Sequence, residues 1–518
     1  MKIMRHFNIY WLTASLVALL ALVALLAIAP WRHVRAAGAQ NQKVRPAGVA
    51  GGFYPADPKV LTAMIDDLLA HATPPPIHDP ILAAVAPHAG YQYTGPVAAD
   101  TFAELKGRKF SRVVVIGPTH YVGFDFTSVY DGDAYTTPLG TVTVDKIFAR
   151  QLVKLNPTLQ LSGMGHDITP AGAEHSIEVE LPWLQRVLGN FQLVPIVMGD
   201  QSYESSRALG VALAKLIQSD NPAGSTLIVA SSDLSHYHTY DEAETMDHKT
   251  LNALAAWDYF SMSQNFQAQV WEACGGAPIV AAMIAAERMG ANQALVLRYA
   301  NSGDTSGDRT SVVGYSADVF VKAANGKAVE TPFSLSDRDK NELLAIARKS
   351  VEQAVEQRKQ YEPGATASEA LNQDRGAFVT LREAGQLRGC IGYTSATKPL
   401  YLTVRNTATL AALRDPRFPP VSASELPQLE YEISVLSPLR RVMDVQQIEV
   451  GRDGLVMKNG DNEGLLLPQV PVDQKPKWDR QKFLEETCRK AGMSSTCWKD
   501  PDTDIFKFTA VVFGEHNP

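Results

Sequence analysis

Histidine is concentrated in the first half of this chain, where it could bind a metal or transfer protons. Nine of the twelve histidines lie within residues 71–248, and residues 249–515 contain none. Three of them follow short β-rich runs: His88 in PHAGY, His120 in GPTHY and His236 in SSDLSHYH. Neutral imidazole binds transition metals and changes its charge near physiological pH. We therefore expect any histidine chemistry in the first half of the chain.

Cys274 could supply a further ligand, because it stands in ACGGAP immediately before a helical pattern. The positive end of a helix dipole lowers the pKa of a nearby thiol and favours the thiolate, which is the metal-binding form. Two imidazoles and a thiolate suit iron, copper or zinc, whereas calcium and magnesium need oxygen ligands. A single histidine after a strand is more often structural. Three of them together with this cysteine favour a shared site, although their spacing matches no local zinc motif.

These residues need a scaffold that brings distant loops together, and the pattern between residues 82 and 321 predicts one. Short β-rich runs alternate there with helical patterns, which indicates an α/β fold with a layered, mostly parallel sheet. The carboxyl ends of parallel strands lie along one edge of the sheet, where the histidines would meet. The predicted strands are Leu82–Ala86, Arg112–Ile116, Gln192–Val197, Thr226–Ala230, Ala294–Tyr299 and Val312–Val321. The predicted helices are Pro96–Leu105, Ile177–Leu188, Tyr203–Gln218, Tyr240–Trp257 and Gly276–Met289.

Length and charge limit the possible classes of function. At roughly 150 residues per domain, the 518 residues predict about two to four domains. Lys and Arg number 48 against 55 Asp and Glu, and the net charge of −7 argues against a nucleic-acid partner. Four cysteines cannot form a disulfide scaffold. If the chain is exported, Cys488 and Cys497 are the one close pair that could form a bridge.

An apolar run from Tyr10 to Ala29 precedes the globular region and contains no charged residue. As a helix, these residues would span about 30 Å, the thickness of a bilayer core. We therefore expect a membrane anchor, with most of the chain exported to a periplasmic or extracytoplasmic space. The alternative is a signal peptide cleaved near Ala37-Gly38-Ala39, which would make the protein secreted. Positive charges flank both sides of the run and weaken the argument for its orientation.

The second half of the chain has a different pattern. A polar stretch at Ala323–Thr331 indicates a linker, and a helical segment follows from Ser336 to about Gln360. The predicted strands after it are Gly376–Arg382, Leu387–Gly392, Tyr431–Leu436 and Ile505–Val512, which together indicate an α+β domain. The run LRGCIG contains Arg388, Gly389, Cys390 and Gly392, which could bind an anion or react through the thiol. It could equally be a hairpin whose glycines serve the backbone and whose cysteine is buried.

Several motifs of the first half resemble the Memo family. They are VRPAGVAGGFYPADP, PHAGYQYTGPVAA, VVVIGPTHY, EHSIEVELPWLQ, SSDLSHYHTY and the region around Cys274. The resemblance implies a fold similar to class III extradiol dioxygenases and a metal held by His88, His120 and Cys274. It also implies that Asp233 and His236 line the same pocket. The dioxygenases use a carboxylate as the third ligand, so the cysteine puts ring cleavage in doubt.

Glu174 and His175 in the EHSIE motif are further candidates. They could support a ligand by a hydrogen bond or act as a general acid and base. They could also cap a helix that begins near Ser176. The predicted catalytic set is therefore Asp233, His236 and His175.

The second half resembles the AMMECR-type family, on the runs GAFVTLREAGQLRGCIGY, DPRFPPVSASELPQLEYEISVLSP and GLLLPQV. The resemblance implies a cleft near the LRGCIG run, with Arg388, Gly389, Cys390 and Gly392 as its candidate site. The expected domains are an anchor or signal segment at 1–40, a Memo-like α/β domain at 41–323, a linker at 324–335 and an AMMECR-type α+β domain at 336–518.

A Memo-like domain and an AMMECR-type domain on one chain resemble the AmmeMemoRadiSam system. They imply a metal-dependent, dioxygenase-like oxidoreductase with iron or copper, acting with a separate radical-SAM protein, since the chain contains no CxxxCxxC motif. The alternative is a non-catalytic module, anchored at the membrane, that binds a metal or a peptide. The sequence does not identify the small-molecule or peptide substrate.

Overall fold

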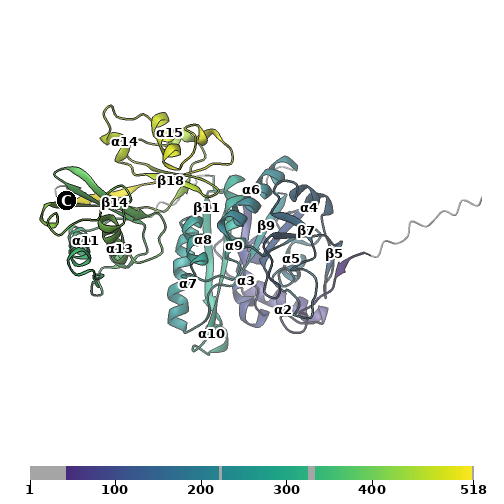
Figure 1. The fold of residues 1–518 in the computed structure, drawn as a ribbon. Helices are drawn as coiled ribbons and strands as arrows, with labels where there is room; N and C mark the ends of the chain where they lie inside the picture. The colour runs from purple at the N-terminus through teal and green to yellow at the C-terminus, as the bar shows by residue number, and fades with distance from the viewer. Residues whose placement is uncertain (1–41, 221–224, 325–332, 516–518) are drawn as a thin grey trace, which may run out of the picture. The chain divides into compact units, whose positions relative to one another are not determined.

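Our computed structural model describes residues 42–220, 225–324 and 333–515, and backbone contacts group Val44–Pro518 into one unit (Figure 1). The unit contains a three-stranded sheet, a nine-stranded sheet and two four-stranded sheets. The first two sheets are formed by residues before 322, and the other two by residues after 376. The fold is therefore mixed α/β and has the two-part layout expected from the sequence.

Four neighbouring strands at the centre of the nine-stranded sheet run parallel. They are β2 (Ile81–Ala86), β9 (Thr226–Ser231), β3 (Arg112–Pro118) and β8 (Gln192–Met198), in that order. Their sequences are almost continuously apolar because both faces are covered: Val113 and Val115 of β3 belong to one buried cluster, Val114 and Ile116 to another. All four carboxyl ends consequently lie along one edge of the sheet.

The outer strands correct the expectation of a mostly parallel sheet. β12 (Val312–Val321) is antiparallel to β2, to β11 (Gln293–Asn301) and to β10 (His236–His238). The connection between β11 and β12 contains only the short helix α10 (Ser302–Ser306), which is too short for the crossover that a parallel pair needs. On the other side, β4 (Thr127–Tyr130) is antiparallel to β8, and β7 (Leu159–Ser162) is parallel to β4.

Helices cover both faces of this sheet. One buried cluster includes side chains of α2 (Pro58–His71), α3 (Tyr91–Leu105) and α5 (Glu180–Leu188). The opposite cluster includes α6 (Tyr203–Asp220), α8 (Tyr259–Gln267) and α9 (Gly276–Arg288). The remaining elements of this part are β1 (Val44–Arg45), β5 (Ala134–Thr137), β6 (Gly140–Thr143), α4 (Lys146–Leu152) and α7 (Tyr240–Ala255).

The second part contains two antiparallel sheets. The first has the order β14 (Gln386–Tyr393), β13 (Ala377–Glu383), β15 (Leu429–Leu436), β20 (Ala510–Gly514), and its core includes α11 (Asp337–Gln357) and α13 (Leu400–Leu413). The second has the order β16 (Arg440–Arg441), β19 (Asp504–Phe508), β17 (Gly454–Asn459), β18 (Asn462–Leu466), and packs with α15 (Arg480–Lys490). Short helices complete it: α12 (Glu369–Asn372), α14 (Val470–Asp473) and the 3₁₀ helices Leu426–Gln428, Val445–Gln447 and Cys497–Lys499.

Two expectations for this part have clear outcomes. The strand expected at Ile505–Val512 is interrupted at Thr509. It forms two strands, β19 and β20, which belong to different sheets. Cys488 on α15 and Cys497 form a disulfide, as the sequence allowed.

The expectation of a membrane-anchored and exported chain requires correction. Among residues 42–220, 225–324 and 333–515, no helix has the length and apolar character needed to cross a membrane. The apolar run Tyr10–Ala29 and the alternative cleavage site both lie outside the described residues. The domain boundaries at 40, 323 and 335 stay predictions.

Candidate metal site

Three neighbouring strands bring distant residues to one edge of the sheet. His88 follows β2 by two residues, Asp233 follows β9 by two, and His120 follows β3 by two. Because β9 lies between β2 and β3 and all three run parallel, their carboxyl ends are adjacent. The ring centroids of His88 and His120 are 5.1 Å apart. The predicted convergence of these loops is thus present in the structure.

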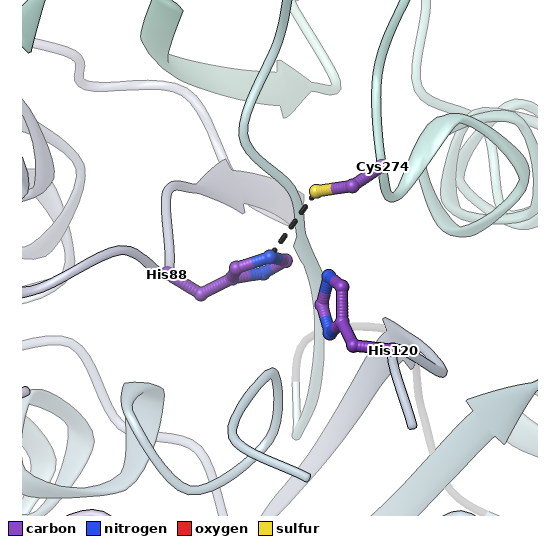
Figure 2. Close-up of side chains that lie close together, drawn as sticks. All are labelled: His88, His120 and Cys274. Carbon is purple, nitrogen blue, oxygen red and sulfur yellow. Dashed lines mark hydrogen bonds between the residues drawn. The ribbon is translucent and has the colours of Figure 1, made fainter. Parts of the chain in front are cut away.

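Cys274 joins this edge because its loop approaches β9 very closely. A Cβ atom at Gly275 would lie 2.3 Å from the carbonyl oxygen of Ser231, so only glycine permits the approach. The backbone N–H of Gly275 donates to Ser232 Oγ at 2.9 Å. As a result, Cys274 Sγ lies 3.1 Å from Nε2 of His88 (Figure 2). The same sulfur lies 3.3 Å from the backbone nitrogen of Asp233.

His88, His120 and Cys274 each offer a ligand atom, and these atoms lie within 4.8 Å of one another. A tetrahedral ion bound at about 2.0–2.3 Å holds its nitrogen and sulfur ligands roughly 3.3–3.7 Å apart. The three side chains therefore need only small movements to hold one ion. The donor set of two imidazoles and a thiol is one that iron, copper and zinc accept.

Glu174 holds His120 in place. Its Oε1 accepts from Nδ1 of His120 at 2.9 Å, and its Oε2 accepts from the backbone nitrogen of His120 at 2.6 Å. Oε1 also accepts from the backbone N–H groups of His175 and Ser176. Burial opposes ionisation of Glu174, but these hydrogen bonds, led by the one from His120, lower its pKa to about 2. Glu174 thus both supports a ligand and caps the following turn, and Nε2 remains as the free nitrogen of His120.

The other two candidate ligands, His88 and Cys274, are neutral in the metal-free protein. Burial, with the nearby His120, lowers the pKa of His88 to about 3. Burial also raises the pKa of the Cys274 thiol, and the carboxylate of Asp233 adds to this. The expected effect of the helix dipole on Cys274 is therefore outweighed, because the thiol is desolvated and faces an acid. A bound cation would favour the thiolate again.

The three predicted catalytic residues surround this cluster. Asp233 is 3% exposed, its Oδ1 accepts from the backbone nitrogen of His88 at 2.8 Å, and burial raises its pKa to about 6. His175 stacks on His120 with centroids 4.5 Å apart, and its buried Nδ1 has no hydrogen-bond partner among the described residues. His236 lies further out, with Nδ1 bonded to the carbonyl oxygen of Leu234 at 2.8 Å. Asp233 and His175 thus contact the ligands directly, whereas His236 acts on His88 and Asp233 electrostatically.

Family models match both parts of the chain. A family model described as Memo-like protein matches residues 45–319, and a model described as AMMECR1 matches residues 344–513. The chain belongs to the Memo family. All of the candidate ligands and catalytic residues lie inside the Memo-like match. The Arg388–Gly392 run lies inside the AMMECR1 match.

Individual relatives cover one part of the chain at a time. A MEMO1 family protein of Methanopyrus kandleri is 38% identical over 288 residues, covering 53% of this chain and 98% of the relative. Protein TK0174 of Thermococcus kodakarensis is 42% identical over 186 residues, covering 34% of this chain and 90% of the relative. The crystal structure of an uncharacterised protein, PH0010 of Pyrococcus horikoshii, is similar at 41% identity with a TM-score of 0.33, covering 34% of this chain and 91% of that protein.

The candidate site in the AMMECR1 part is built differently from the Memo site. Gly389 faces α13, where a Cβ atom would lie 2.2 Å from the carbonyl oxygen of Ala411. Cys390 Sγ accepts from Thr380 Oγ1 at 3.2 Å, and burial raises the pKa of its thiol. Arg388 bonds Glu425 at 2.6 Å. A Cβ atom at Gly392 would lie 2.2 Å from the ring of Phe378.

Close packing against α13 and against Phe378 requires glycine at both positions. The candidate site formed by Arg388, Gly389, Cys390 and Gly392 stays a prediction. The described residues show no histidine near Cys390, so the region contains no thiol–imidazole pair.

Two residues that support the Memo site were not identified from the sequence. Ser231 accepts or donates a hydrogen bond at Nδ1 of His88, at 2.8 Å, and it also contacts Glu180 at 2.8 Å. Both residues lie in quoted motifs, SSDLSH and EHSIEVE, but a serine at a strand end and a glutamate in a helix are common. The one signal is that Glu180 stands among apolar residues of a buried helix face.

Proposed function

We propose that the Memo-like part binds a redox-active transition metal, iron or copper, through His88, His120 and Cys274, and acts as a metal-dependent oxidoreductase. The observation that carries this proposal is the convergence of three ligand atoms within 4.8 Å from three separate loops. Both histidines are also held through Nδ1, by Ser231 and by Glu174, which aims their Nε2 atoms away from these supports.

The protein's own residues would position a substrate and hold protons around the site. A bound iron or copper ion would supply electron transfer or Lewis-acid activation. His175 stacks on His120, and its Nδ1 makes no hydrogen bond among the described residues and lies 3.8 Å from Oε1 of Glu174, so it is placed to donate or accept a proton. The carboxyl group of Asp233 is tied to the backbone of His88 and Ala89, which keeps it beside the ligands, and His236 is the outer member of the set.

The proposal follows the resemblance to class III extradiol dioxygenases only in part. A cysteine replaces their carboxylate ligand, so we propose oxidoreduction and not ring cleavage. We also propose a separate radical-SAM protein as a partner, because Memo-like and AMMECR1 matches occur together in this chain. A small molecule or a peptide would be the substrate.

A non-catalytic metal-binding or peptide-binding module is the second candidate, and the burial of the site favours it. His88 is 1% exposed, Cys274 is half-buried and His120 is exposed. A substrate would approach from the exposed side of the site, where His120 and the half-buried Cys274 lie. An ion held mainly on the side of the buried His88 would be retained without reacting.

Metal analysis tests the site itself. The full chain, purified without added metal, should contain iron or copper by elemental analysis and show it in an electron paramagnetic resonance spectrum. The variants His88→Ala, His120→Ala and Cys274→Ala should each lose the metal. His238→Ala is the matched control, because His238 pairs with Glu272 outside the cluster. Unchanged metal content in all three ligand variants would refute the proposal.

Oxygen consumption separates the enzyme from the binding module. Iron-loaded protein should consume oxygen with a catechol or with a modified peptide, and His175→Ala should slow this while keeping the metal. Metal-loaded protein that stays inert with every reductant and substrate would favour the binding module.

A further inference from the structure

Ser231 lies at the centre of a buried hydrogen-bond network behind His88. Its Oγ is 2.8 Å from Nδ1 of His88, 2.8 Å from Oε1 of Glu180 and 2.5 Å from the carbonyl oxygen of Ser176. All of these residues are at most 1% exposed. Bulk water therefore does not reach the three contacts, and the hydrogens of the protein atoms themselves have to satisfy them.

The single hydrogen of the Ser231 hydroxyl determines which groups donate in these hydrogen bonds. A hydroxyl group has one hydrogen and can accept two hydrogen bonds. The carbonyl oxygen of Ser176 can only accept, and it is the shortest contact, so the hydrogen of Ser231 belongs there. The other two partners must then donate to Ser231: His88 through Nδ1–H, and Glu180 through a protonated carboxyl group. If Glu180 were ionised and accepted the hydrogen of Ser231, lone pairs of Ser231 Oγ and of the Ser176 carbonyl oxygen would face each other at 2.5 Å.

The surroundings of Glu180 agree with a neutral carboxyl group. Among the described residues, Oε2 of Glu180 has no hydrogen-bond partner, and Oε1 is hydrogen-bonded to Ser231 alone. A buried carboxylate needs two or three donors to remain ionised. Burial raises the pKa of Glu180 well above its ordinary range, Ser231 opposes the rise, and the nearby Asp233 adds to it.

We propose that Glu180 is held as a neutral carboxylic acid and that, through Ser231, it fixes His88 with its proton on Nδ1 and its lone pair on Nε2. Nε2 is the atom that faces Cys274 Sγ at 3.1 Å, so the support prepares His88 as a ligand before any ion arrives. Glu180 and Ser231 are positioning residues. Their role for the metal rests on the proposed function, whereas the protonation pattern belongs to the metal-free protein.

Two readouts on metal-free protein test the protonation pattern directly. The infrared difference spectrum between wild type and Glu180→Gln should show the carbonyl stretch of one protonated carboxyl group in wild type. If this difference spectrum instead showed a carboxylate band for wild type, the proposal would be overturned. Nuclear magnetic resonance of ¹⁵N-histidine-labelled chain should show His88 protonated on Nδ1. In Ser231→Ala, the proton of His88 should shift toward Nε2. Protonation of His88 on Nε2 in wild type would also overturn it.

Cobalt titration tests the positioning role. Ser231→Ala should bind Co²⁺ about 10–100-fold more weakly than wild type. Glu180→Gln, whose amide can still donate to Ser231, should stay within about threefold, while Glu180→Leu should weaken binding like Ser231→Ala. Ser235→Ala is the control, since the buried hydroxyl of Ser235 has no hydrogen-bond partner among the described residues.

The outcomes separate the two proposals. Wild-type protein that binds no metal contradicts the proposed function, while the infrared and magnetic resonance results still decide the protonation of Glu180 and His88. Full binding by Ser231→Ala and by Glu180→Leu refutes the positioning role alone.

Discussion

Replacing Glu174 by glutamine should weaken metal binding by releasing His120. The carboxylate accepts four hydrogen bonds, three at Oε1 and one at Oε2. An amide oxygen at the position of Oε1 keeps three of them, but its NH₂ group then faces the backbone N–H of His120, whose nitrogen is 2.6 Å from Oε2 in the native protein. The opposite orientation of the amide loses the other three. Either way, the loop that carries His120 must move.

The size of the effect follows from these contacts. Loss of a carboxylate that orients a metal-bound histidine typically costs about 10–100-fold in affinity, which is about 1.4–2.7 kcal/mol. A buried N–H group left without an acceptor costs about 1–3 kcal/mol of folding free energy. We therefore expect Glu174→Gln to bind metal at least tenfold more weakly and to unfold at a slightly lower temperature.

The assay is a metal titration of the full chain against a competing chelator at constant pH, with circular dichroism to establish folding. Glu272→Gln is the matched control, because Glu272 pairs with His238 at 3.0 Å but touches no ligand. Folded Glu174→Gln that binds metal within about threefold of wild type would refute the argument that Glu174 positions His120. An equal loss in Glu272→Gln would show that the effect is not specific to this pair.

Three further predictions concern stability. Burial raises the pKa of Asp318 from 3.8 to about 7, so the folded state binds a proton more tightly than the unfolded state does. The free energy of unfolding should therefore fall as the pH rises from about 4 to 7. Asp318→Asn should remove this fall and be more stable than wild type by up to about 4 kcal/mol at pH 8 but not at pH 4, measured by urea unfolding; a pH-independent difference contradicts it. Gly389→Ala should cost about 1–3 kcal/mol in thermal unfolding because its methyl group would lie 2.2 Å from a carbonyl oxygen of α13, whereas Gly364→Ala, which meets no atom within 4 Å, should not. The Cys488–Cys497 bridge closes a loop of sequence separation 9, so its reduction should cost about 2.5 kcal/mol, and titration should find two free thiols in the native chain, not four.

The strands and the ligands could be predicted from the sequence because their signals are local. The apolar run Arg112–Ile116 and the following GPTHY place His120 at a strand end without any knowledge of the partners, and His88 follows from the same pattern. The start of α3 could not be predicted, because Pro96 suggested a helix beginning there, whereas the helix begins at Tyr91 and includes the proline. The antiparallel outer strands were also missed, since strand direction depends on connections and not on composition.

The supports of the site depend on contacts that no local pattern reports. Glu174 could be interpreted as a cap or as a support, and its two oxygens do both. Ser231 and Glu180 are 51 residues apart and meet only because β9 and α5 are brought together by the fold. The pKa of Cys274 was predicted with the wrong sign, because the desolvation of the thiol exceeds the effect of the helix dipole.

The close approach at Gly275 has a consequence for protein engineering. Transplanting this site onto another parallel sheet would require more than two histidines and a cysteine at the right strand ends. The recipient would also need a glycine after the cysteine and a serine like Ser232, because a methyl group at Gly275 would push the thiol away from the sheet edge. The minimal transferable unit is therefore the three ligands together with this backbone contact.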